Sequence, residues 1–139
     1  MAEIKIEIVE LEEKTYHPLI KADFPGLDGF WWVVDTGASR SVFDHTFTDY
    51  YSLDSDEQVM ATGLGKEMVE TNSGIIHSFK LDGIDFGDLH VALINFLHIN
   101  TEYAKFSDKQ IIGLLGSDFL YTHQAVLDFN NLNVKLVQK

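Results

Sequence analysis

Apolar and charged residues alternate at the start of the chain, where Ile4, Ile6 and Ile8 are separated by Lys5 and Glu7. A period of two residues is typical of a β-strand with one buried face. The same pattern, or a short apolar run between turn residues, returns along most of the sequence. It predicts further strands at residues 15–24, 30–35, 58–62, 75–81, 90–96, 110–115, 125–129 and 133–137.

Turn residues separate these predicted strands. The Asp-Gly pair at 82–83 lies between two apolar segments and is a strong signal for a two-residue hairpin. The proline and glycines within 25–29 mark another turn, and the asparagines at 130–131 separate the last two strands. A glycine-rich turn at 63–65 is expected to join strands 58–62 and 75–81 as a hairpin.

One segment predicts a helix, near residues 117–122. Ser117 is a good N-cap residue and Asp118 would lie in the first turn, where a negative charge is favourable. Residues 43–51 lack alternation and are compatible with a short helical turn.

Many short strands, glycine-containing turns and one short helix predict an all-β sandwich or barrel. The length of 139 residues predicts a single domain, residues 1–139.

The charge balance narrows the possible partners. The chain has 22 acidic and 10 basic residues, for a net charge of −12, which argues against nucleic acid or an anionic membrane as a partner.

No apolar run approaches the ~20 residues of a membrane span, and the N-terminus lacks the pattern of a signal peptide. The absence of cysteine excludes disulfides and thiolate metal sites and fits a reducing compartment. We therefore expect a soluble, cytoplasmic protein.

Several reactive residue types lack the context that their usual chemistry requires. The six histidines form no H-x-x-x-H or H-E-x-x-H pair, so no metal site is predicted. Ser39, Ser41 and Ser117 lack a G-x-S-x-G context, which disfavours a serine hydrolase. Arg40 is expected to be solvent-exposed, with pairing to an acid across a dimer as the alternative.

The candidate catalytic residue is Asp35, at the end of the apolar run 30–35. Thr36 can donate and accept hydrogen bonds within the turn that follows, and Gly37 permits a close approach by substrate or a second chain. Ala38 and Ser39 are small enough to leave the carboxyl group accessible. An ordinary Asp-Thr-Gly turn that closes a hairpin is the structural alternative.

A second motif lies about 80 residues downstream, at Leu114-Leu115-Gly116. Together with residues 35–38 it resembles the paired signature of the retropepsin-like aspartic proteases. In that family, a strand of two apolar residues and a glycine packs beside the catalytic loop and leads into a short helix. Residues 125–129 then resemble the family's last hairpin. The resemblance extends from about residue 30 to residue 137.

The resemblance implies an all-β, closed or nearly closed acid-protease-like barrel and an aspartic endopeptidase. Because the chain carries Asp-Thr-Gly only once, it implies a homodimer in which two Asp35 carboxyls meet across a two-fold axis. They would share one proton and activate a water on a peptide or protein substrate. Thr36 would bond to the opposite subunit. The mechanism needs no metal or cofactor.

The resemblance also implies a flap that closes over bound peptide, and Gly63, Leu64 and Gly65 are the best candidates for its tip. A plain glycine-rich hairpin turn is equally compatible with these residues. Two other functions stay open. One is a non-catalytic peptide-binding or dimerisation module that retains the protease fold. The other is a β-barrel that binds a small ligand and in which Asp-Thr-Gly is only a turn.

Overall fold

The computed structural model describes the backbone of residues 1–62 and 68–139 and the side chains of residues 1–54 and 72–139. Most of the described elements are strands. They are β1 (Ala2–Lys5), β2 (Glu7–Glu12), β3 (Thr15–Lys21), β4 (Phe30–Val34), β5 (Val42–Asp44), β6 (Ser52–Thr62), β7 (Met68–Ile76), β8 (Lys80–Leu81), β9 (Ile84–Asp85), β10 (Leu89–Ile94), β11 (Gln110–Leu115), β12 (Val126–Asp128) and β13 (Asn133–Leu136). The helical segments are η1 (Thr48–Tyr50), α1 (Leu97–Tyr103) and α2 (Ser117–Thr122).

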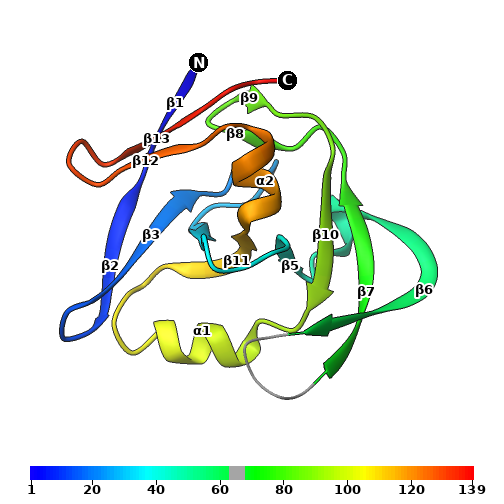
Figure 1. The fold of residues 1–139 in the computed structure, drawn as a ribbon. Helices are drawn as coiled ribbons and strands as arrows, with labels where there is room; N and C mark the ends of the chain where they lie inside the picture. The colour runs from blue at the N-terminus through cyan, green and yellow to red at the C-terminus, as the bar shows by residue number, and fades with distance from the viewer. Residues whose placement is uncertain (63–67) are drawn as a thin grey trace.

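The largest sheet has eight strands in the order β2-β3-β4-β11-β5-β10-β7-β6. Two of its neighbouring pairs are parallel, β4 with β11 and β5 with β10. A second sheet joins the two ends of the chain in the order β1-β13-β12, and β8 pairs with β9. The N- and C-termini accordingly lie near each other (Figure 1).

The all-β class is confirmed, but the described sheets do not close into a barrel. The edge strands of the eight-stranded sheet are β2 and β6, and they lie on opposite sides of the molecule (Figure 1). Each edge strand belongs to a hairpin that projects outward, β2–β3 on one side and β6–β7 on the other. The expected closed or nearly closed barrel is therefore not confirmed.

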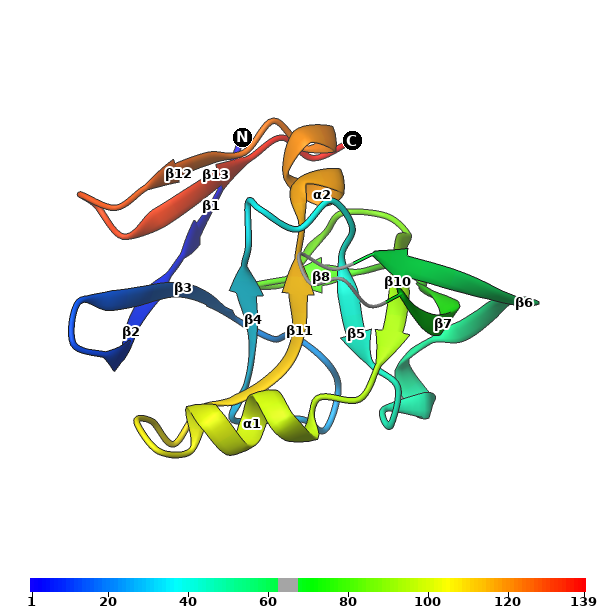
Figure 2. The same cartoon turned by 60° about the horizontal axis from the view of Figure 1, so that its bottom comes forward.

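The core lies on both faces of this sheet because successive residues of β4 point in opposite directions. Trp32 and Val34 belong to the larger apolar cluster, where the Trp32 ring stacks on Phe43 with centroids 5.5 Å apart. Val33 belongs to a smaller cluster that also contains Tyr103 of α1. Figure 2 shows α1 and α2 near opposite ends of β11. The loop that follows β4 thus starts from a strand buried on both faces.

Several elements differ from the sequence prediction. The alternating start forms two strands, since the Ile6 amide donates to Leu132 (3.0 Å) and the chain passes from one sheet to the other. The hairpin arms are β6 and β7, whereas the predicted arm 75–81 spans the end of β7 and the start of β8. Helix α1 was not predicted. Its seven residues are too few to produce a clear helical period.

Other predictions are confirmed. Strand β11 covers residues 110–115, and α2 covers 117–122. Asp82 and Gly83 both adopt positive φ angles, 51° and 76°, as a two-residue hairpin turn requires. The N-cap of α2 is Gly116 rather than Ser117, however, and no side chain caps this helix. No helix of the described ranges is long and apolar enough to cross a membrane.

Candidate active site

The structure places the two sequence motifs side by side. Asp35 directly follows β4, and its backbone amide donates to the carbonyl of Leu115 at 2.9 Å. Strands β4 and β11 run parallel, with Val33 beside Leu114 and Val34 beside Leu115. Since parallel neighbours end at the same edge of a sheet, the turn after β4 and the turn after β11 meet there.

Hydrogen bonds within the turn after β4 orient the side chain and backbone of Asp35. The Gly37 amide donates to Asp35 Oδ1 at 3.0 Å, and the Ala38 amide donates to the Asp35 carbonyl at 3.2 Å. Aspartate commonly forms such a bond to the backbone two residues ahead. Asp35 itself is half-buried, whereas Thr36, Gly37 and Ser39 are exposed. One carboxylate oxygen is therefore oriented by the loop while the residues around it stay open to another molecule.

Gly116 is the point of closest approach between the two turns. A Cβ atom on this residue would lie 2.7 Å from the Ala38 carbonyl oxygen and 2.8 Å from the carbonyl carbon of Arg40. Both atoms belong to the backbone, so any larger residue would push the turns apart. The neighbouring Ser117 amide donates to the same Ala38 oxygen at 2.7 Å. Glycine at this position lets β11 support the loop that carries Asp35.

A buried polar network, missed by the sequence analysis, fixes the end of the Asp35 loop. Ser41 is fully buried, and its hydroxyl donates to Asp118 Oδ1 at 2.8 Å while its amide donates to Oδ2 at 2.9 Å. The Gly116 amide in turn donates to Ser41 Oγ at 3.0 Å. Ser41 and Asp118 therefore link the two motifs. Each follows one motif closely in sequence, and that position is the signal that could have identified them.

A second pair missed by the sequence analysis lies on the α1 side of the sheet. The Tyr103 hydroxyl and His17 Nδ1 are hydrogen-bonded at 2.5 Å, and Tyr103 is only 4% exposed. Burial, and then the negative charge of Asp35, raise the pKa of Tyr103 to about 12. The electrostatic effect of Asp35 thus reaches the face on which α1 packs.

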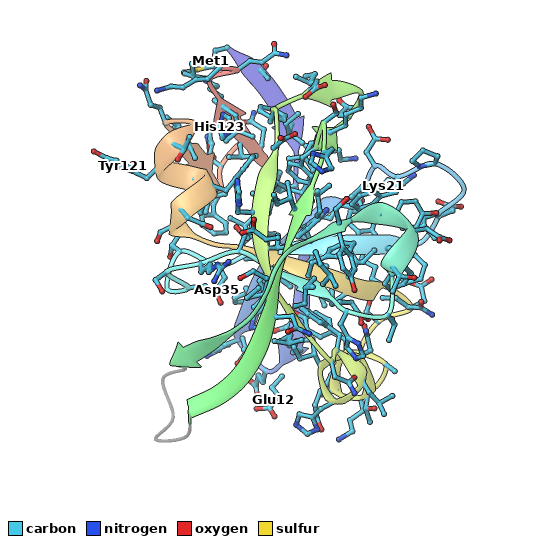
Figure 3. The ribbon with its side chains drawn as sticks, turned by 90° about the vertical axis from the view of Figure 1, so that its right-hand side faces the viewer. Met1, Glu12, Lys21, Asp35, Tyr121 and His123 are labelled. Atoms are coloured by element: carbon cyan, nitrogen blue, oxygen red, sulfur yellow. The ribbon has the colours of Figure 1, made fainter. Side chains whose placement is uncertain are left out.

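The predicted flap tip, Gly63, Leu64 and Gly65, lies outside the described residues. The described arms are β6 and β7, which pair in antiparallel register up to Thr62 and Met68. Their hairpin projects from the body of the molecule on the side where Asp35 is labelled (Figure 3). A hydrogen bond from Arg40 Nη2 to Ser73 Oγ, 2.9 Å long, joins β7 to the Asp35 loop.

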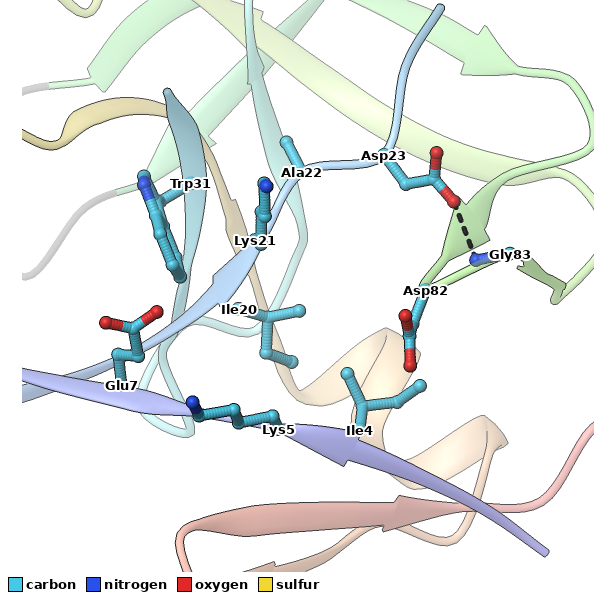
Figure 4. A pocket seen from close by; sticks show the side chains of 10 residues that line it. All are labelled: Ile4, Lys5, Glu7, Ile20, Lys21, Ala22, Asp23, Trp31, Asp82 and Gly83. Carbon is cyan, nitrogen blue, oxygen red and sulfur yellow. Dashed lines mark hydrogen bonds between the residues drawn. The ribbon is translucent and has the colours of Figure 1, made fainter. Parts of the chain in front are cut away.

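The two best-defined cavities of the described chain do not include Asp35. One, of about 500 Å³, lies around Tyr50 and Tyr51. The other, of about 490 Å³, lies where β1 and β3 face the β8–β9 turn, and the Gly83 amide there donates to Asp23 at 2.8 Å (Figure 4). Its lining mixes lysines and carboxylates.

One comparison with known proteins covers the segments that carry both motifs. The sequence model of the aspartyl protease family matches residues 20–119, which include both Asp35 and the β11 strand. A search of curated proteins and a search of solved structures found no match. The matched region covers well over half of the chain. The chain therefore belongs to the aspartyl protease family.

Proposed function

We propose that the protein is an aspartic endopeptidase whose active site forms between two copies of the chain, each of which contributes Asp35. The observation that carries the proposal is the position of Asp35 on a loop that is hydrogen-bonded to β11 and packed against Gly116. A family match and a single Asp-Thr-Gly sequence support it, because aspartic protease chemistry needs two carboxyls and one chain supplies one.

In the proposed mechanism the two Asp35 carboxyls share one proton, since two like charges at close range do not both persist. The ionised carboxylate removes a proton from a bound water, and the water oxygen attacks the carbonyl carbon of the peptide bond. The protonated carboxyl donates to the carbonyl oxygen, which gives a gem-diol. Collapse of the gem-diol with protonation of the amine nitrogen releases the two product peptides.

Exposed apolar side chains in the segment from α2 to β13 support the homodimer. Tyr121 of α2 is 87% exposed and projects into solvent (Figure 3), and Val126 of β12 is 52% exposed. Phe129 and Leu132, between β12 and β13, are also exposed. Strand β12 is an edge of its sheet and, among described strands, pairs only with β13. An exposed edge with apolar residues is a ready template for a second chain.

We call the exposed residues Tyr121, Val126, Phe129 and Leu132 the α2–β12 face and propose that they form one contact surface. In the proposed dimer it contacts its counterpart, and the exposed Thr36 bonds to the other subunit. A cytoplasmic location remains part of the proposal and depends on the cysteine-free sequence.

The test is cleavage of a mixed peptide library by the wild type and by Asp35→Asn, read by mass spectrometry. We expect wild-type cleavage and a loss of about a thousandfold or more in the variant, which keeps the shape but not the acid–base function. Asp28→Asn is a matched control, because Asp28 is an exposed acid paired with Lys21 at 3.7 Å. Cleavage that survives Asp35→Asn would refute the mechanism. A stable dimer without any cleavage would favour the non-catalytic binding module.

A further inference from the structure

Arg40 is the only arginine in a chain that has 22 acidic residues. It lies on the Asp35 loop, five residues after the aspartate, and is half-buried. Its side chain donates to the neutral hydroxyl of Ser73. The ion pairs of the described side chains use other cations, namely Lys21, His77, His90, Lys105 and Lys109. Within the described part of the chain, no carboxylate lies within ion-pair distance of Arg40.

Arg40 is held at both ends. Its carbonyl packs against Gly116, where a Cβ atom would lie 2.9 Å from the carbonyl oxygen, and the next residue, Ser41, is fixed by Asp118. At the other end, Ser73 is 3% exposed and belongs to β7, a strand of the projecting hairpin. The guanidinium group therefore spans from the Asp35 loop to β7 in a fixed position.

A guanidinium carries five N–H donors, and the bond to Ser73 uses one. The remaining donors match the two oxygens of a carboxylate, which forms the strongest pairs with arginine. A peptide that carries an acidic side chain would otherwise be repelled by a chain of net charge −12. A fixed cation that has no carboxylate partner among the described side chains, placed between the Asp35 loop and β7, is the feature that offsets this repulsion.

We propose that Arg40 is a specificity residue which binds a carboxylate of the peptide substrate, supplied by an Asp or Glu side chain close to the scissile bond. This inference rests on the proposed function, because it places the substrate beside the Asp35 loop and Ser73 of β7. Ser73 orients the guanidinium, and the rigid backbone at Gly116 limits the entropy that binding costs.

The test compares kcat/KM for peptides that differ only by Glu or Gln at positions flanking the cleaved bond. We expect the wild type to prefer Glu by about tenfold, as a charge-assisted pair provides. In Arg40→Gln the Glu-to-Gln ratio should fall to about one, and in Arg40→Glu a Lys peptide should become preferred over the Glu peptide. Lys105→Gln, which removes an exposed cation paired with Glu102, should keep the wild-type ratio.

Three outcomes would overturn the proposal. An equal loss on all peptides, with the ratio unchanged, would make Arg40 a purely structural tie between the loop and β7. A weaker dimer in Arg40→Gln by sedimentation, again with an unchanged ratio, would assign its partner carboxylate to the second subunit. A preference that is lost when the peptide C-terminus is amidated, and that does not depend on the Glu side chain, would place the terminal carboxylate at Arg40.

Binding separates this inference from the proposed function. In the Asp35→Asn background, the dissociation constants of the Glu and Gln peptides are measured by fluorescence anisotropy, without turnover. A preference for the Glu peptide that disappears in Asp35→Asn/Arg40→Gln supports the role of Arg40 even if the wild type cleaves nothing. Equal binding of both peptides to Asp35→Asn contradicts it, whatever the activity of the wild type.

Discussion

The Asp35 loop and the α2–β12 face differ in whether their side chains find partners within one chain. In the loop region the buried polar groups find partners within the chain, as Ser41 does with Asp118 and Gly116. On the α2–β12 face, large apolar side chains such as Tyr121 and Val126 stay in contact with water. One chain therefore supplies the hydrogen-bond partners of the first region, whereas the apolar side chains of the second region stay exposed in one chain.

This difference suggests that the position of Asp35 is set within one chain, whereas the proposed reaction depends on two chains. One chain suffices to hold Asp35 in position, because β11, Gly116 and the buried Ser41–Asp118 pair define the loop. The reaction that we propose needs a second carboxyl, and the uncovered apolar face offers a way to bring it. Substitutions in the two regions should therefore have distinct effects, on folding in the first region and on association in the second.

The largest effect on stability is expected from Asp118→Ala. This substitution leaves the buried amide and hydroxyl of Ser41 without acceptors, which costs about 3 kcal/mol. Urea denaturation at a fixed protein concentration measures the loss. Asp108→Ala, at an exposed position, is the control and should change the free energy of unfolding by less than about 0.5 kcal/mol. Equal effects of both substitutions would show that the network does not hold the loop.

The next effect is on association. Val126→Asp places a charge on the edge strand of the α2–β12 face in both copies, and we expect the dimer to weaken about a hundredfold. Sedimentation velocity over a dilution series measures the dissociation constant. Leu53→Asp changes a similarly exposed residue on β6, which lies on the other side of the molecule (Figure 1), and should leave the dimer intact. A dimer unaffected by Val126→Asp would move the interface elsewhere.

The smallest effect concerns Tyr103 and appears only in alkali. An unfolded chain loses this proton near pH 10, whereas the folded protein retains it until about pH 12. Between these values the unfolded state binds fewer protons, so the contribution of Tyr103 to stability falls as the pH rises. The stability advantage of wild type over Tyr103→Phe should shrink by up to about 2 kcal/mol from pH 9.5 to 12. A constant difference would show that the hydroxyl titrates normally.

The sequence predicted those elements whose signals are local. Strand β11 is a continuous apolar run, and the turn at 82–83 is an Asp-Gly pair whose positive φ angles few other residues adopt. The position of Asp35 at the end of β4 followed from the apolar residues before it. In each case, neighbours along the chain determine the conformation.

The features missed by the sequence analysis depend on contacts between distant segments. Ser41 and Asp118 are 77 residues apart, and neither has a local pattern that reveals its partner. The Tyr103–His17 bond likewise joins α1 to β3. A sandwich or barrel was expected from the number of strands and a closed barrel from the family resemblance, but closure depends on where the edge strands β2 and β6 lie in space. Strand patterns do not contain that information.

The central claim, that the active site belongs to two chains, is tested most directly by mixing wild type with Asp35→Asn. The two proteins are refolded together at constant total concentration, well above the dissociation constant of the dimer, and peptide cleavage is measured against the wild-type fraction. If each dimer needs two Asp35 carboxyls, activity follows the square of that fraction, and an equal mixture retains about one quarter. If each chain acts alone, the same mixture retains about one half, and this result would contradict the account.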